Sequence, residues 1–241
     1  MENRKKPLQR HFSYQHPTFG TKNRPKPESA WKKSVYYWWW AYLKRNQDYL
    51  KCCENNGGGK LANLYKDFGD VRGDNFKEWW GSNTRGVDLF AEPSAEDSIR
   101  VIHQGESVLS SDEALTVSFP INLPKRFLEK RFRELLVELH PGKPGRQLAK
   151  KSKAKYKVRG QLNIYSLKLA LEVYDFKVTN PKLKLWEIGN AIPKFYLEQK
   201  IKASDTPSTL VDKKIKLAVS VSRSLKRVKD SIKATSEGFF P

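Results

Sequence analysis

Long apolar runs and metal-binding clusters are missing from this 241-residue chain. No stretch approaches the roughly 18 apolar residues of a membrane-spanning helix, and no apolar segment follows the basic N-terminus, as one would in a signal peptide. The two cysteines, Cys52 and Cys53, are neighbours that pair poorly, and the four histidines are scattered, so we expect neither a disulfide nor a zinc site. These absences predict a cytoplasmic protein with reduced cysteines, no metal, no cofactor and no membrane contact.

Acidic residues are too few to balance the basic ones. The chain has 46 Lys and Arg against 26 Asp and Glu, a net charge of +20. A fold does not need this excess, and self-repulsion destabilises it, so the composition predicts a polyanionic partner. Residues 1–53 have 12 basic and 3 acidic residues, a net charge of +9. Residues 54–114 have 6 basic and 12 acidic residues, a net charge of −6. Residues 115–241 have 28 basic and 11 acidic residues, a net charge of +17. The strongest binding surface is therefore expected in the C-terminal half.

Motifs of the common enzyme classes are absent or incomplete. DFGDV contains the kinase tripeptide without a glycine-rich loop or an HRD-type segment, and NNGGGK lacks the spacing of a P-loop. Asp67, Asp70, Asp74 and Glu78 form an acidic cluster of the kind that holds Mg²⁺ in a nuclease, but turn caps and a solvated face explain these residues as well. We predict that the chain is not an enzyme.

Helical periodicity and large apolar side chains are what the sequence does contain. At 38% hydrophobic and 12% aromatic residues, the composition argues against global disorder. The pattern predicts an α+β fold that is mainly α. Its four expected parts are a basic flexible arm (1–27), an aromatic-rich helical domain (28–95), a polar linker (96–114) and a basic helical domain (115–241).

Local patterns also predict individual elements. LTVSFPI (115–121) alternates apolar and polar residues as a strand does, and RGVDLFAEP (85–93) is a second, shorter strand candidate. Helices are expected to begin at or beside Pro124, Asn163, Asn180-Pro181, and Ser208 or Thr209.

Five adjacent aromatic residues, YYWWW at 36–40, lie in a helix that we expect to begin near Glu28. Adjacent aromatics wind all the way round a helix, which is typical of a buried element. We therefore predict that Trp38 and Trp39 lie in a core, in a domain that is also a candidate for docking a protein partner or a second copy. Stacking of bases from a single strand is the alternative.

The last expected helix is the most informative element. At 100° per residue, one of its arcs holds Leu217, Val221, Leu225, Val228 and Ile232. The other side is basic, with Asp230 as its one acid; its cations are Lys213, Lys216, Arg223, Lys226, Arg227, Lys229 and Lys233. Solvated helices usually mix both signs, so this face predicts nucleic-acid contact, with an ordinary amphipathic helix as the alternative.

A second basic segment, 143–159, contains no acid. Its candidate binding residues are Lys150, Lys151, Lys153, Lys155, Lys157 and Arg159. Such a segment releases counterions from a phosphate backbone, and Ser152 and Tyr156 are candidate donors of phosphate hydrogen bonds. We predict phosphate contact here without base reading.

Between the two basic segments, LKLWEIGNAI (183–192) has the pattern of the first helix of a helix-turn-helix. Ile188 and Ile192 are expected to pack inward, and the small Gly189 to let two helices cross closely. The connection 194–207 is longer than the usual turn, so the motif would be a variant. A core helix in an α-helical bundle is the alternative.

YYWWWAYLKRNQDY (36–49), YKDFGDV (65–71), FKEWW (76–80) and DLFAE (88–92) together resemble the N-terminal region of bacterial proteins carried by prophages, plasmids and other mobile elements. Those proteins pair an aromatic W-x-x-x-FLRRN-x-x-Y segment with a regulator-like helix-turn-helix region. The resemblance implies DNA binding in a mobile-element or phage-related setting, and it implies no catalytic residues. This chain departs from the pattern in its cysteine pair and in the connection 194–207.

These observations predict a DNA-binding protein, either a regulator or an accessory subunit of a bacterial mobile-element, phage or anti-phage system. It would contact the phosphate backbone through the basic segment and the last helix. The alternative is a structural RNA-binding subunit of a ribonucleoprotein complex, and a Mg²⁺-dependent nuclease is a third, more distant one.

Overall fold

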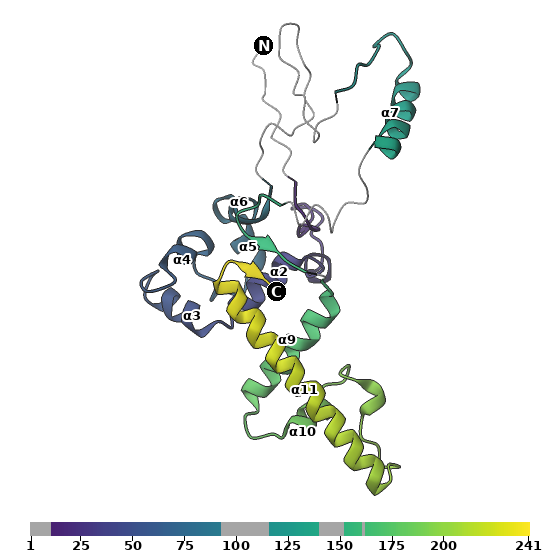
Figure 1. Cartoon of the computed structure of the whole chain (residues 1–241). Helices are drawn as coiled ribbons and strands as arrows, with labels where there is room; N and C mark the ends of the chain where they lie inside the picture. The colour runs from purple at the N-terminus through teal and green to yellow at the C-terminus, as the bar shows by residue number, and fades with distance from the viewer. Residues whose placement is uncertain (1–10, 93–115, 140–151, 161) are drawn as a thin grey trace.

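Helices dominate the part of the chain that this computed structural model describes, which is residues 11–92, 116–139, 152–160 and 162–241 (Figure 1). The helices are α1 (Glu28–Trp31), α2 (Val35–Leu43), α3 (Gln47–Glu54), α4 (Ala62–Phe68), α5 (Phe76–Gly81), η1 (Ser82–Thr84), α6 (Arg85–Phe90), α7 (Lys125–Leu139), α9 (Ile164–Thr179), α10 (Leu185–Ala191), η2 (Leu197–Gln199) and α11 (Pro207–Ser236). Two short strands, β1 (Lys157–Val158) and β2 (Phe239–Phe240), pair in parallel. The predicted class, α+β and mainly α, is confirmed.

The larger hydrophobic core surrounds α2. Eight of its nine residues are buried, and Trp39 has no exposed surface. Its indole lies among the rings of Phe68, Phe90 and Phe240, with centroids 5.2–6.1 Å away. A helix that is apolar on every side has to be covered on every side, so the prediction that the aromatic block is core is confirmed.

Residues 11–27 lie against this core, although the sequence predicts a flexible arm for 1–27. The ring of Phe12 lies 5.8 Å from that of Tyr36, and the ring of Phe19 lies 5.9 Å from that of Phe76. The charge and the prolines of this segment are typical of an extended arm, but its two phenylalanines provide apolar surface that packs on the core. Residues 1–10 lie outside the described part of the chain, as does the whole predicted linker 96–114.

A second, smaller core lies between α9, α10 and α11. It contains Val173, Ile188, Ile192, Phe195, Leu217 and Val221. The predicted close crossing at Gly189 is present: a Cβ atom there would lie 3.0 Å from Val221 Cγ2 and 3.2 Å from Leu217 Cδ2. Helix packing of this kind does not show nucleic-acid contact, so the helix-turn-helix interpretation stays a prediction.

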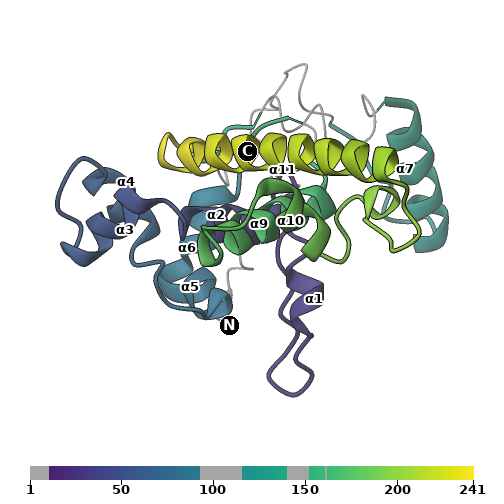
Figure 2. The ribbon, with the colours of Figure 1, turned by 90° about the horizontal axis from the view of Figure 1, so that it is seen from below.

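Helix α11 joins the two cores, because it crosses α10, α9 and α2 in turn (Figure 2). Its Leu217 and Val221 lie in the smaller core, and its Val228 and Ile232 lie in the larger one. The larger core thus draws residues from both of the predicted domains.

Two local predictions are wrong. Thr116–Pro120 forms no strand, because strand-like alternation needs a second strand to pair with and the structure shows none beside this segment among the described residues. Arg85–Phe90 is the helix α6 rather than a strand. Within the described residues, no helix combines the length and the apolar character needed to cross a membrane.

The predicted helix starts are confirmed in part: the aromatic block lies in α2, which begins at Val35 and is separate from α1 at Glu28, and Asn180 ends α9 and does not cap α10. Asn163 caps α9 as predicted, by accepting a hydrogen bond from the backbone N–H of Ser166 at 3.0 Å. Helix α10 begins at Leu185, four residues after Pro181, where the Glu187 carboxylate accepts from the backbone N–H of Lys184. Helix α11 begins at Pro207, one residue before the predicted cap.

Candidate nucleic-acid interface

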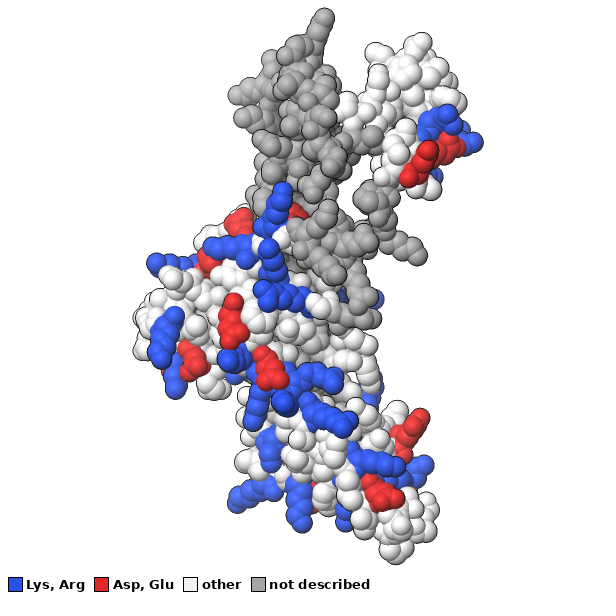
Figure 3. Space-filling view, in the orientation of Figure 1, with Lys and Arg blue, Asp and Glu red and all other residues white. Residues whose placement is uncertain are grey.

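Helix α11 presents a basic face over its C-terminal half. The arc predicted to face inward is buried at Leu217, Val221, Val228 and Ile232 and half-buried at Leu225. On the solvent side the exposed cations are Arg223, Lys226, Arg227, Lys229 and Lys233, with Asp230 as the one acid among them. Figure 3 shows the blue side chains gathered across the middle of the molecule, where this part of α11 runs.

The pairing of β1 with β2 brings two more exposed cations close to this part of α11. Lys157 pairs with Phe239 and Val158 with Phe240, and the backbone N–H of Arg159 donates to the Phe240 carbonyl at 2.7 Å. Because β2 follows α11 after a short turn, Lys157 and Arg159 lie at the C-terminal end of α11. Both are exposed, while Val158 between them is buried.

The resulting set is called the α11–β1 basic surface. It consists of Lys157, Arg159, Arg223, Lys226, Arg227, Lys229 and Lys233. The Arg159 guanidinium lies over the Phe239 ring, 4.3 Å from its centroid, a cation–π contact with the residue that pairs with Lys157. Lys233 Nζ lies 3.6 Å from a carboxylate oxygen of Glu237, one turn further along.

The structure places the other predicted cations elsewhere. Lys213 is half-buried, because it faces the connection between α10 and α11; its Nζ contacts Asp205 Oδ1 at 2.6 Å and the Lys200 carbonyl at 3.0 Å. Lys155 Nζ pairs with Asp67 at 2.7 Å. Lys216 is exposed in the N-terminal half of α11, about two turns before Arg223, and Lys153 is exposed four residues before β1. Lys150 and Lys151 lie outside the described residues.

The two candidate donors of the basic segment have partners within the fold. Ser152 Oγ donates to Glu92 Oε1 at 2.6 Å, and Tyr156 Oη donates to Asp67 Oδ2 at 2.6 Å. Burial raises the pKa of Tyr156, and the neighbouring Asp67 carboxylate raises it further. Both hydroxyl groups thus hold the segment 152–158 against the larger core, and their contact with phosphate stays a prediction.

Glu92 is the centre of this attachment. Its carboxylate accepts hydrogen bonds from Ser13 Oγ at 2.5 Å, from Ser152 Oγ and from the backbone N–H of Lys153 at 2.7 Å. Burial by itself would raise the pKa of Glu92, but these hydrogen bonds outweigh burial and hold the pKa below its ordinary value. One carboxylate thus joins residues 11–27, the end of the aromatic region and the basic segment.

We expect Glu92→Gln to lower the free energy of unfolding by about 1–3 kcal/mol at neutral pH, because charge-assisted hydrogen bonds are lost. The folded-state pKa lies below the unfolded value of about 4.3, so the contribution of Glu92 is present above that pH and is lost as the pH falls through the folded pKa. Urea denaturation at neutral pH and in steps down to about pH 3 measures the difference between variant and parent. The difference should shrink in acid, and an exposed control, Glu54→Gln, should show none. An equal difference at every pH contradicts the assignment.

Lys200 holds the long connection between α10 and α11. Its Nζ donates to the carbonyls of Gly189 at 2.6 Å, Asn190 at 2.7 Å and Ile192 at 2.5 Å, at the C-terminal end of α10. Desolvation lowers the pKa of this lysine. Sequence reasoning missed the role of Lys200, because one lysine in a basic chain has no pattern to distinguish it.

The acidic residues considered for Mg²⁺ do not converge. Each has a separate partner, and the pairs are Asp67 with Lys155, Asp70 with Arg72, Asp74 with Lys44 and Glu78 with Asn75. Among the described residues, no three His, Cys, Asp or Glu side chains lie together in a way that would hold a metal ion. These carboxylates act as local ion-pair partners and caps.

The comparisons with known proteins add no assignment to this geometry. No protein-family model, no curated protein and no solved structure matches the chain.

Proposed function

We propose that this chain is a DNA-binding protein that holds the phosphate backbone of a duplex on the α11–β1 basic surface. The observation that supports it best is the β1–β2 pairing, which brings exposed cations from two predicted basic segments close to one another at the C-terminal end of α11. Seven cations with few acids repel one another in the free protein, and phosphates relieve that repulsion.

The dimensions of the surface suit a duplex. Arg223 and Lys233 are ten residues apart on a helix, which is about 15 Å along its axis. Duplex DNA has one negative charge about every 1.7 Å of its axis, so this length faces several phosphates. The helix is rigid because its other side is packed into both cores.

The contact is proposed to be with the backbone and not with base edges. Helix-turn-helix proteins read bases mainly with the N-terminal residues of the second helix. The exposed N-terminal half of α11 includes the apolar Val211, Ile215 and Val219, which interrupt its few donors, while the cations gather in the C-terminal half. A role as regulator or accessory subunit in a mobile-element, phage or anti-phage system rests on the resemblance of the N-terminal region alone.

Equilibrium binding to random-sequence duplex DNA at several salt concentrations tests the proposal. We expect log Kd to rise linearly with log salt concentration, with a slope of about 0.9 for each phosphate contact and a total of about 6 if all seven cations take part. Structured RNA and single-stranded DNA of equal charge serve as competitors. Preferential retention of the duplex supports the proposal, stronger competition by RNA favours a ribonucleoprotein subunit, and a salt-independent or undetectable affinity contradicts both.

A further inference from the structure

Helix α7 has an apolar seam that the described residues only partly cover. Leu128, Phe132, Leu135 and Leu139 follow one another at spacings of four, three and four residues, as the inward positions of a coiled coil do. No residue of α7 is buried, and Leu139 is 53% exposed. In Figure 1 the helix lies away from the other helices.

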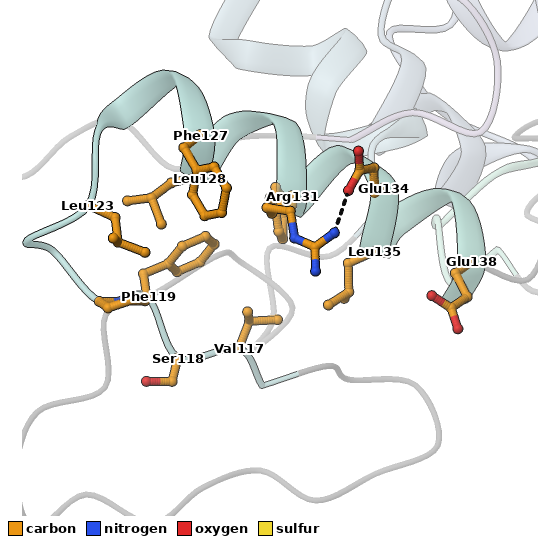
Figure 4. A pocket seen from close by; sticks show the side chains of 12 residues that line it. Val117, Ser118, Phe119, Leu123, Phe127, Leu128, Arg131, Glu134, Leu135 and Glu138 are labelled. Carbon is orange, nitrogen blue, oxygen red and sulfur yellow. Dashed lines mark hydrogen bonds and ion pairs between the residues drawn. The ribbon is translucent and has the colours of Figure 1, made fainter.

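Residues 117–123 cover one part of this seam and leave a groove beside it. The ring of Phe119 lies 5.5 Å from that of Phe132 and is itself 44% exposed. The groove between this segment and α7 has a volume of about 280 Å³, and its lining includes Leu128, Leu135 and Leu123 (Figure 4). An apolar groove on a short exposed helix is expected to take up another apolar element from water.

The charges beside the seam indicate which element that is. Arg131 and Glu138 are seven residues apart, which puts them on the same flank, and both line the groove. Arg131 Nη1 donates to a carboxylate oxygen of Glu134 in the same helix at 2.9 Å. The opposite flank has Glu129 and the apolar Leu136. One flank of α7 thus has a basic residue near the middle of the helix and an acidic residue near its C-terminal end.

We propose that α7 pairs with α7 of a second copy of this chain, in antiparallel orientation. In that orientation the flank with Arg131 faces the same flank of the other copy, so Arg131 meets the partner's Glu138 and the reverse pair forms by symmetry. In parallel orientation Arg131 would face the partner's Leu136 instead. Within α7 the charge pattern matches the antiparallel pair, whereas a parallel pair would place Arg131 beside an apolar residue.

Sedimentation velocity of the full chain without nucleic acid, over a wide range of concentration, tests the pairing independently of the proposed function. We expect a reversible monomer–dimer equilibrium. Leu135→Glu should abolish the dimer because it places a charge in the seam. Val137→Glu makes the same change at a residue that is 81% exposed and outside the seam, and it should leave the dimer intact. A chain that stays monomeric at every concentration, or a dimer that survives Leu135→Glu, overturns the proposal.

Charge reversal tests the orientation. Arg131→Glu and Glu138→Arg should each weaken the dimer by about tenfold or more, because two ion pairs become two repulsions. The double variant restores both pairs and should return to near the parental Kd. Lys130→Glu, an equal charge change away from the seam, should have little effect. Failure of the double variant to recover overturns the antiparallel pair. Circular dichroism confirms that each variant is folded, which is expected since α7 contributes to neither core.

Discussion

Replacing Arg223, Lys226, Arg227 and Lys229 together with glutamate is expected to weaken binding to duplex DNA by about a thousandfold or more. Each charge-assisted contact with phosphate contributes at least about 1 kcal/mol, and four are lost at once. The four side chains are exposed, so the fold should survive the change. The corresponding alanine variant should lower the salt slope by about 3.6, that is about 0.9 for each contact.

The control for this variant changes the same amount of charge on another face. Lys22, Arg24, Lys26 and Lys33 are all exposed and lie in the N-terminal part of the chain. Their replacement with glutamate should cost much less affinity, because only the long-range attraction is reduced and salt screens it. If both variants weaken binding equally, net charge and not the α11–β1 basic surface determines affinity, and the proposed interface is wrong.

Trp39→Ala is expected to lower the free energy of unfolding by about 3–5 kcal/mol, a large part of the stability of an ordinary domain. The side chain has no exposed surface and contacts rings from α4, α6 and β2. Its Nε1 has no hydrogen-bond partner among the described residues. Trp39→Phe removes that unpaired N–H together with part of the ring, so its loss should be clearly smaller.

Urea denaturation and near-ultraviolet circular dichroism measure these effects, with Tyr165→Ala as the control. Tyr165 is an aromatic residue that is 55% exposed, and its removal should change stability by less than about 1 kcal/mol. A Trp39→Ala protein with parental stability and lost nucleic-acid binding contradicts the core assignment and supports base stacking.

Helix faces and some helix boundaries could be predicted because they depend on neighbours in the sequence. The cap at Asn163, the buried arc of α11 and the close approach at Gly189 all follow from local chemistry or from 3.6-residue periodicity. The strand predicted for 115–121 is absent at 116–120. A segment with alternating apolar and polar residues forms a strand only when a second strand supplies its backbone hydrogen bonds.

The composition and periodicity of this sequence determined by themselves that the chain is mainly helical, that its aromatic block is buried and that its last helix has one apolar and one basic side. Only the tertiary structure decided which cations lie together. Lys157 and Arg159 join α11 through a pairing of residues some eighty positions apart, while Lys213 and Lys155 are taken up by Asp205 and Asp67. The physical reason is that the charge of a side chain is a local property. Whether a cationic side chain is free to bind phosphate depends on which distant carboxylate, carbonyl or strand the fold brings within hydrogen-bonding distance of it.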